Sequence, residues 1–357
     1  MPMSSRASSL AEVLDEMTAV GAPELTEQLG ERSLRCYACG HRCLIKEGKR
    51  GICKVRYNEE GRLLVPFNYV AALACDPTEK KPFFHALPGS DTLTFGMLGC
   101  DLHCGYCQNW LTSQALRDDA AGVAPKMVTA DKLVSLAKAY GASLVGSSYN
   151  EPLITAEWAV DVFKRAKPAG FKTAFISNGN ATPQVLDYLR PWTDCYKIDL
   201  KSMSDRNYRK LGGVVDNILE TIQMVHERGF WEEIVTLVIP GFNDSEDELR
   251  SAADFIASVS PDIPWHVTAF HQDYNMTENA NTTAGQLIRA CEIGRAAGLR
   301  FVYAGNLPGR VGRWENTYCP SCDELLIERY GYQIRRMKVT PTGNCPSCSA
   351  TIPGIWS

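Results

Sequence analysis

Residues 92–109, TLTFGMLGCDLHCGYCQN, constrain this chain more than any other stretch. The first seven are rich in β-branched and apolar side chains and predict a buried strand that ends near Gly99. Three cysteines follow at once, Cys100, Cys104 and Cys107. Three thiolates on one short loop can hold three corners of a 4Fe-4S cluster. Because no fourth cysteine is nearby, one iron would stay open, which is typical of a reaction site. The alternative is a zinc site built from the same three thiolates, although zinc knuckles usually pair their cysteines two by two.

Composition narrows the class of protein. The 357 residues are enough for one large barrel with small appendages. The fourteen cysteines are clustered along the chain, which favours metal sites over disulfides. A net charge of -4 gives no electrostatic basis for nucleic-acid binding. The sequence contains no secretory h-region and no apolar run of membrane-spanning length, so we expect a cytoplasmic protein without membrane contact.

Strand-like and helix-like stretches alternate between residues 92 and 305. The strand-like stretches are TLTFGML, SLVGSSY, KTAFISN, CYKIDLK, EIVTLVIP, WHVTAF and, as a possible seventh, FVYAGN. This alternation predicts an α/β fold with a parallel sheet, which we interpret as a partial (β/α)6 barrel over residues 92–310. In such folds the chemistry lies at the carboxyl ends of the strands. Polar candidates follow several of these strands: Asn150, Glu151, Asn178, Gly179, Asp199, Lys201 and His271.

Two further segments precede the predicted barrel. Residues 1–34 are expected to form a helical lead-in, and residues 35–91 a cysteine-rich module with a connector. The module contains a C-x2-C-x3-C-x9-C set, and four thiolates in eighteen residues can close a tetrahedral zinc site. A second iron–sulfur cluster or four free thiols are the alternatives, and zinc is favoured. The four residues are Cys36, Cys39, Cys43 and Cys53.

The connector ends in DPTEKKPFFHALPGS. Lys80, Lys81 and His85 in this stretch could line the mouth of an active site. A solvated charged loop is the plainer interpretation of the same residues.

Residues 311–357 are expected to form a separate tail. Two C-P-S-C knuckles, one at Cys319 and Cys322 and one at Cys345 and Cys348, flank a stretch that alternates like a hairpin. Paired knuckles of this kind predict a zinc ribbon. A module this small has too little core to fold without metal. A rubredoxin-like iron site is the alternative.

The cysteine loop resembles that of the radical S-adenosylmethionine (radical SAM) superfamily. More closely, the sequence resembles the AmmeMemoRadiSam system radical SAM enzymes, relatives of the pyruvate formate-lyase activating enzymes. The stretches that carry this resemblance are the N-terminal cysteine set, DPTEKKPFFHALPGS, GCDLHCGYCQNW, SYNEP, IDLKSM, AGNLPG and the C-terminal CPSC pair. The resemblance implies a cluster that reductively cleaves S-adenosylmethionine to a 5′-deoxyadenosyl radical, which then abstracts hydrogen from a substrate that the sequence does not identify.

The resemblance also implies roles for single residues. Tyr106 would pack against the adenine, and Asn150 with Glu151 would hold the amino group of S-adenosylmethionine. Asn178 and Gly179 match a turn beside the ligand. Lys201, in the segment Asp199-Leu200-Lys201, would pair with the methionyl carboxylate, and His271 would reach the ribose.

The sequence departs from the activating enzymes at two places. Tyr149 and Asn150 replace the glycines of the motif after the second strand, and Ile176 stands where those enzymes carry an aspartate. The second change argues against a cation site and against an inherited glycyl-radical partner. Glycyl-radical activation and a non-catalytic zinc or iron–sulfur scaffold are therefore the alternative functions. The expected electron donor is a flavodoxin or ferredoxin, and the family relationship also suggests Memo-like and AMMECR-type partners.

Overall fold

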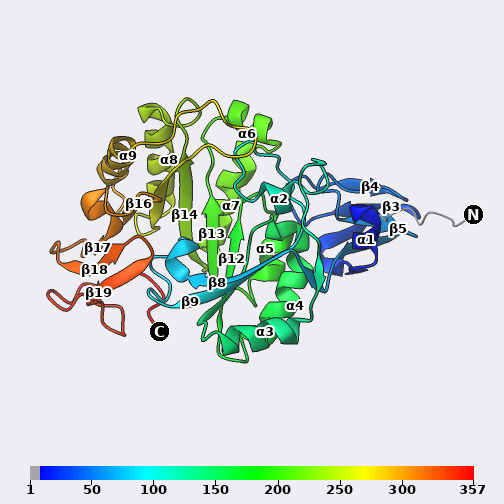
Figure 1. Ribbon diagram of the computed structural model, residues 1–357, viewed down its shortest axis with the longest axis horizontal. Helices are drawn as coiled ribbons and strands as arrows, with labels where there is room; N and C mark the ends of the chain where they lie inside the picture. The colour runs from blue at the N-terminus through cyan, green and yellow to red at the C-terminus, as the bar shows by residue number, and fades with distance from the viewer. Residues whose placement is uncertain (1–8) are drawn as a thin grey trace, which may run out of the picture.

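The computed structural model describes residues 9–357, and one eight-stranded sheet organises it (Figure 1). Strand β9 and strands β11 to β16 pair in parallel, in chain order, and β8 adds antiparallel to β9. The sheet is open, with β8 and β16 at its two edges. The seven predicted strands are confirmed, and the fold is of the α/β class. The strands are β8 (Ala72–Pro77), β9 (Asp91–Gly96), β11 (Leu144–Ser147), β12 (Lys172–Ser177), β13 (Cys195–Asp199), β14 (Trp231–Val238), β15 (Trp265–Ala269) and β16 (Val302–Gly305).

Helices connect the parallel strands and bury one apolar side of each against the sheet. Leu133 of α3, Ile218 and Ile222 of α7 and Leu287 of α9 belong to one continuous core. Thr182 caps α5 by accepting a hydrogen bond from the Val185 amide, with proline at the first helical position. Because all seven parallel strands run the same way, their carboxyl ends meet at one edge. The helices are α2 (Trp110–Ser113), α3 (Ala130–Ala139), α4 (Ala156–Ala166), α5 (Pro183–Leu189), α6 (Asp205–Leu211), α7 (Val215–Glu227), α8 (Glu246–Val259) and α9 (Ala284–Ala296).

Over residues 9–34 short helical stretches alternate with short strands, so the predicted helical lead-in over residues 1–34 is wrong for most of the residues that the structure describes. The helical stretches are α1 (Leu10–Asp15), capped by Ser9, and the 3-10 helix η1 (Pro23–Leu25); residues 1–8 lie outside the described part. Gly21 and Pro23 interrupt the helical pattern, and pairing with a distant strand then decides the conformation. The strands form two small sheets, in the orders β1-β6-β5 and β2-β3-β4. They are β1 (Thr18–Val20), β2 (Thr26–Gln28), β3 (Ser33–Cys36), β4 (Leu44–Lys46), β5 (Tyr57–Glu59) and β6 (Arg62–Pro66).

The connector does not end where the barrel was predicted to begin. Strand β8 pairs with β9 from Ala72 opposite Gly96 to Pro77 opposite Asp91, and so belongs to the main sheet. A second pair, β7 (Tyr69–Val70) with β10 (Lys126–Met127), lies beside it. The boundary at residue 92 is therefore about twenty residues too late, because the sequence gives no sign that this strand is antiparallel to the next.

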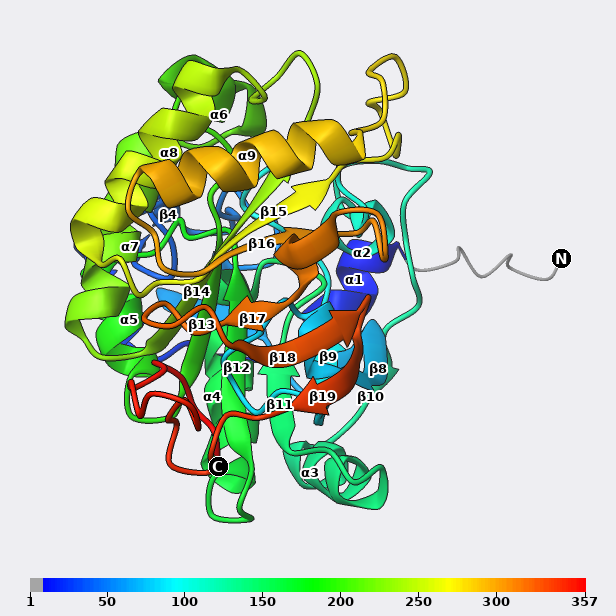
Figure 2. The same ribbon diagram turned by 90° about the vertical axis from the view of Figure 1, so that its left-hand side faces the viewer.

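The C-terminal segment forms the predicted hairpin and packs closely on the main sheet. Its strands β17 (Thr317–Tyr318), β18 (Leu325–Tyr330) and β19 (Gln333–Met337) pair antiparallel, and Figure 2 views the molecule from their side. Phe84 of the connector and Tyr303 of β16 share one apolar cluster with Leu326 and Ile327 of β18. The tail is therefore not an isolated module. In Figure 1 it lies at the opposite end of the sheet from the N-terminal segment.

Candidate active site at the carboxyl ends of the strands

A cavity of about 390 Å³ lies at the carboxyl ends of the parallel strands. Cys100, Cys104 and Cys107 contribute to its wall, as do residues that follow β11, β12 and β13. Its size is in the range typical of small-molecule sites. Most of the polar residues predicted from the strand ends therefore do face one space.

The three cysteines follow β9 on a tight loop. Gly99 has φ 97°, and a Cβ there would lie 3.0 Å from a methyl group of Val55, so glycine is required. Cys100 Sγ accepts a hydrogen bond from the Leu102 amide at 3.4 Å, and Cys107 Sγ lies 3.2 Å from the Ser113 hydroxyl. Burial raises the pKa of the Cys104 thiol to about 11, although Lys201 opposes this shift. An unliganded thiol here resists ionisation, and a bound metal would supply the missing positive charge.

The spacing of these sulfur atoms fits a cluster better than a single ion. The four C-terminal cysteines gather within 4.8 Å of one another, whereas the three loop sulfurs do not. One zinc ion needs its ligands close together around a single centre. A 4Fe-4S cluster places each thiolate on a different iron and requires the wider arrangement. The donor set of three soft thiols beside an open cavity therefore suits the cluster.

The segment after β11 is held by its own side chains. Asn150 Oδ1 accepts from the Met97 amide at 2.9 Å. The Glu151 carboxylate accepts from the Ser177 hydroxyl and the Asn178 amide, both at 2.7 Å. Burial, and then the negative charge of Asp101, raise the pKa of Glu151 to about 8. In this structure Glu151 joins the ends of two neighbouring strands.

The turn after β12 contains the predicted Asn178 and Gly179. A Cβ on Gly179 would lie 2.7 Å from the Ile198 side chain, and its φ is 78°. Asn178 Nδ2 donates to Asp101 at 2.7 Å, and Asn180 Nδ2 donates to the other oxygen of Asp101 at 2.8 Å. Asn178 lines the cavity, whereas Gly179 shapes the turn behind it. Asp101, fully buried between two cluster-loop cysteines, was missed by sequence reasoning.

Strand β13 presents a lysine pair around one carboxylate. Lys201 Nζ lies 3.4 Å from one oxygen of Asp199, and Lys197 Nζ bonds the other. Burial lowers the pKa of Lys201, but Asp199 outweighs it and holds the pKa well above its usual value. Both lysines line the cavity. Lys197 was missed, although alternation along CYKIDLK places it on the same side as Asp199 and Lys201.

The two remaining predicted ligand contacts differ in position. Tyr106 is buried, lines the cavity and packs edge-on against Phe242 at 5.8 Å between ring centroids. His271 is exposed and is not part of the cavity wall. Its Nε2 lies 2.9 Å from the side-chain nitrogen of Gln108, and Gln108 does line the cavity. Asn306 and Tyr332 also line the cavity. The sequence offered AGNLPG as a signal for Asn306 and none for Tyr332.

The four N-terminal cysteines do not gather into one compact group. Cys39 instead meets His41 and Asp101 within 4.8 Å. Its Sγ lies 3.6 Å from His41 Nδ1, and that nitrogen lies 3.6 Å from Asp101 Oδ2. This contact connects the N-terminal module to the loop that contains Cys100, Cys104 and Cys107. Cys36 and Cys53 are buried in different apolar clusters, and Cys43 is half-buried.

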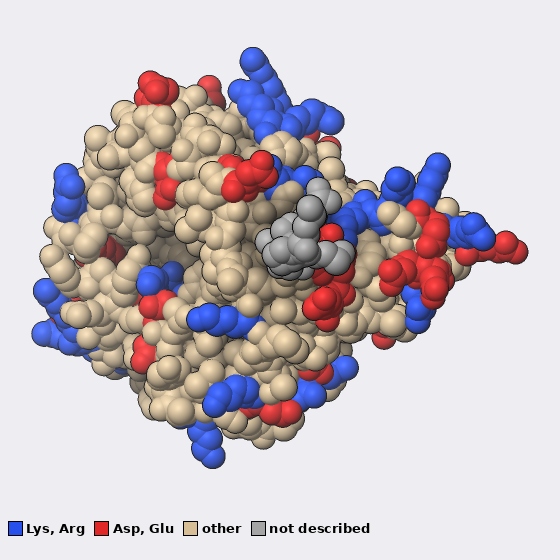
Figure 3. Space-filling model, turned by 45° about the vertical axis from the view of Figure 1, so that its right-hand side comes forward, with Lys and Arg blue, Asp and Glu red and all other residues tan. Residues whose placement is uncertain are grey.

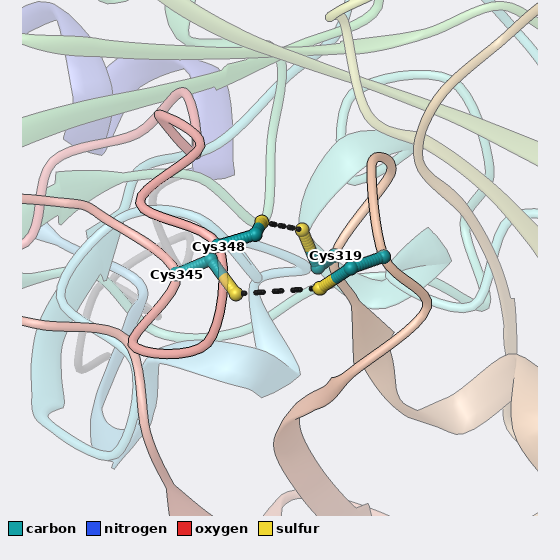
Figure 4. A group of neighbouring side chains, drawn as sticks. Cys319, Cys345 and Cys348 are labelled. Carbon is teal, nitrogen blue, oxygen red and sulfur yellow. Dashed lines mark hydrogen bonds between the residues drawn. The ribbon is translucent and has the colours of Figure 1, made fainter.

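The four C-terminal cysteines converge from two loops, as Figure 4 shows. Cys319 Sγ lies 3.5 Å from Cys348 Sγ, and Cys322 Sγ lies 3.7 Å from Cys345 Sγ. Four sulfurs at these distances form a donor set that can hold one metal ion.

The molecular surface shows no large area of a single charge on the side seen in Figure 3, where basic and acidic side chains are interspersed around a hollow. None of the helices within residues 9–357 has the length and apolar character needed to cross a bilayer.

Comparisons with known proteins match this chain to one superfamily model and to several relatives. The family model described as the radical SAM superfamily matches residues 95–256. An uncharacterised protein of Methanocaldococcus jannaschii is 33% identical over 329 residues, which cover 91% of this chain and 97% of that protein. The pyruvate formate-lyase 1-activating enzyme of Escherichia coli is 27% identical over 205 residues, covering 54% of this chain and 80% of the enzyme. A crystal structure of a domain of pyruvate-formate lyase-activating enzyme from Bacteroides vulgatus superposes with a TM-score of 0.41 at 24% identity, covering 45% of this chain and 98% of that one.

Proposed function

We propose that the chain, whose residues 95–256 match the radical SAM superfamily model, is an enzyme that cleaves S-adenosylmethionine reductively and passes the resulting radical to a substrate. One observation carries the proposal. The three loop cysteines line the same cavity as Glu151, Asn178 and Lys201, which suit a zwitterionic ligand. We further infer that the open sheet is the partial barrel of this superfamily.

In this proposal the cluster would supply the electron, and the protein would position S-adenosylmethionine. When bound by Cys100, Cys104 and Cys107, a 4Fe-4S cluster supplies the single electron that breaks the C5′–S bond of S-adenosylmethionine. The chain positions that ligand. Lys201 would meet its carboxylate with a charge-assisted hydrogen bond, since its ammonium is buried and charged. Asn150 and Glu151 would receive its amino group.

The remaining contacts complete this placement. Tyr106 would pack against the adenine, because its ring is fixed in the cavity wall by Phe242. Asn178 and Gly179 would form the turn beside the ligand. His271 would reach the ribose from the rim, after moving from its contact with Gln108.

Metal outside the cluster has a structural role in this proposal. The C-terminal sulfurs would hold one zinc ion, and Cys36, Cys39, Cys43 and Cys53 a second. Their closure around the second ion requires side-chain movement from the positions described above. The protein would work in the cytoplasm with a flavodoxin or ferredoxin as electron donor, and Memo-like and AMMECR-type proteins are candidate partners.

Two alternatives make different predictions. Glycyl-radical activation is suggested by the relatives named as activating enzymes, but Ile176 places an apolar side chain in the cavity wall. A non-catalytic scaffold would have no use for Lys197, Asp199 and Lys201 in that wall. The buried charged groups therefore favour an enzyme.

The test is anaerobic cleavage of S-adenosylmethionine after reconstitution and reduction with dithionite. We expect slow formation of 5′-deoxyadenosine and methionine without substrate, measured by chromatography. The Cys100→Ala, Cys104→Ala, Cys107→Ala triple variant supplies the cluster-free control. The proposal fails if a fully loaded and reduced sample yields no more product than that control, with candidate substrates supplied.

A further inference from the structure

A second lysine pair lies at the rim of the cavity, on the segment between β8 and β9. Lys80 Nζ bonds Asp76 Oδ1 at 3.0 Å, and Lys81 Nζ bonds Asp76 Oδ2 at 2.9 Å. Lys81 is buried with 6% of its side chain exposed, whereas Lys80 is 48% exposed. Both line the cavity. His85 of the same segment does not, since it is buried between Tyr303 and the carbonyl of Pro353.

This group repeats the chemistry of Lys197, Asp199 and Lys201. In each group two ammonium groups share one carboxylate, so one positive charge remains for an anion that enters the cavity. The group on β13 faces the ligand carboxylate in the proposed function. The proposed function assigns no ligand group to Lys80 and Lys81, so their remaining positive charge is available to a second anion.

Tyr149 lines the cavity and contacts Lys81 of this group. It is a non-glycine residue with φ 68°, a conformation that costs about 1 kcal/mol or more for an L side chain. Its hydroxyl receives a hydrogen bond from Lys81 Nζ at 3.0 Å, and the same ammonium lies 4.9 Å from its ring centroid. Glycine would relieve the strain but would lose this contact. A strained tyrosine beside Asn150 and Glu151 thus fixes the buried lysine next to the proposed S-adenosylmethionine site.

Two further polar residues that line this cavity come from the C-terminal part of the chain. Asn306, after β16, has φ 67° and donates to the Ala269 carbonyl at 3.2 Å. The hydroxyl of Tyr332, at the turn between β18 and β19, lies 3.4 Å from Asn306 Oδ1. Both side chains line the cavity with the lysines. An organic molecule bound to the lysines would find further hydrogen-bonding groups in the wall of the same cavity.

We propose that Lys80, Lys81 and Tyr149 form an anion subsite for the substrate, and that the substrate is a small organic molecule with a carboxylate or phosphate group. This inference rests on the proposed function and adds the substrate class to it. A charged group on the lysines would place the rest of the molecule between Tyr332 and the bound S-adenosylmethionine.

Equilibrium dialysis tests the subsite without catalysis. The reconstituted protein is saturated with S-adenosylmethionine, without reductant, so that the Lys201 group is already filled. Radiolabelled inorganic phosphate and succinate are then titrated at low ionic strength. We expect one saturable equivalent of at least one anion, and a loss of affinity of about tenfold or more in Lys80→Gln, which removes one charged hydrogen bond. Lys80→Glu should abolish binding.

The controls separate this site from general charge effects. Lys167→Gln removes another lysine paired with an aspartate, Asp194 at 2.7 Å, that does not line the cavity, and should leave anion binding unchanged. Lys81→Gln is a second test and should also weaken anion binding. If this substitution of a buried lysine prevents folding, Lys80→Gln still tests the subsite, because Lys80 is half exposed. Binding of phosphate alone or succinate alone would support the subsite and identify the group.

Two results would overturn the subsite: no saturable binding of either anion, or equal binding by Lys80→Glu and the wild type. The same wild-type preparation is afterwards reduced and assayed for 5′-deoxyadenosine. Anion binding without that product would contradict the proposed function and leave the subsite standing. Formation of 5′-deoxyadenosine without anion binding would contradict the subsite and leave the proposed function standing.

Discussion

The four cysteines of the C-terminal module lie within one compact group, whereas the four of the N-terminal module are near one another without forming such a group: Cys36 and Cys43 share one apolar cluster, and Cys53 belongs to another. The C-terminal sulfurs all lie within 4.8 Å of one another. In the N-terminal module Cys36 packs with Leu34 and Ile45, and Cys53 packs with Val55 and Ile154. Both modules have the same number of thiols, so the arrangement of the backbone makes the difference.

The two C-terminal knuckles share one turn geometry. The amide of Asp323 donates to the Cys319 carbonyl at 3.0 Å, and the amide of Ser349 donates to the Cys345 carbonyl at 2.9 Å. Asp323 and Ser349 both adopt the left-handed conformation, with φ 56° and 63°. Two equivalent turns facing each other aim their sulfurs at one centre. The N-terminal spacing of two, three and nine residues has no such repetition.

A buried arginine anchors each module to the central part of the fold, one to helix α4 and the other to the segment between β8 and β9. Arg56 pairs with both oxygens of Glu157, at 2.6 and 2.7 Å. Arg329 lies 3.8 Å from Glu79 and donates to the Phe84 carbonyl at 2.9 Å. The N-terminal module thus has a close ion pair and its own apolar clusters. The C-terminal module has a longer ion pair, between Arg329 and Glu79, and we expect its folding to depend more on bound metal.

The largest effect should come from Cys345→Ala. We expect loss of one zinc ion and unfolding of the tail, because structural zinc stabilises isolated finger peptides by about 10 kcal/mol or more. Metal analysis and limited proteolysis of the full chain measure both. Ser347→Ala, within the same knuckle, is the matched control and should keep zinc and protease resistance. Stoichiometric iron in the wild type would replace the zinc assignment with a rubredoxin-like site.

A smaller effect on stability is expected from Cys36→Ala. We expect this variant to lose the second zinc ion while its module stays folded, because Leu34, Ile45 and the Arg56–Glu157 pair remain. Metal content and thermal unfolding provide the measurements. His41→Ala is the comparison and should retain zinc if four thiolates bind it. Zinc retained in Cys36→Ala but lost in His41→Ala would assign the ion to Cys39, His41 and Asp101 instead.

The sequence predicted the parts of the molecule that depend on local pattern. The strand alternation and the cysteine spacings identified the sheet, the cavity edge and the C-terminal donor set. The helical lead-in failed because pairing of Thr18–Val20 with β6 outweighed helical periodicity. Asp101 and Tyr332 were missed because their importance comes from residues distant in the chain: Asp101 meets Asn178, and Tyr332 meets Asn306. No local pattern encodes such contacts.

The N-terminal module reaches the cavity wall indirectly, through the contact of His41 with Asp101, which bonds Asn178. Affinity for S-adenosylmethionine should show how much this indirect contact contributes beside Lys201. Lys201→Ala should weaken binding by about ten- to a hundredfold with the cluster intact, because a charged hydrogen bond contributes about 1.5–3 kcal/mol. His41→Ala should have a smaller effect, roughly fivefold. It removes an ion-pair partner of Asp101 at 3.6 Å, and Asp101 orients Asn178; a partly exposed ion pair contributes about 1 kcal/mol or less. Tyr37→Phe, in the same module but bonded to exposed Glu27, is the control and should bind normally. Isothermal titration of reconstituted protein gives the affinities.

Unchanged binding of S-adenosylmethionine in Lys201→Ala would exclude the role of Lys201. Equal losses in Lys201→Ala and His41→Ala would mean that the contact from the N-terminal module contributes as much to this binding as Lys201 does.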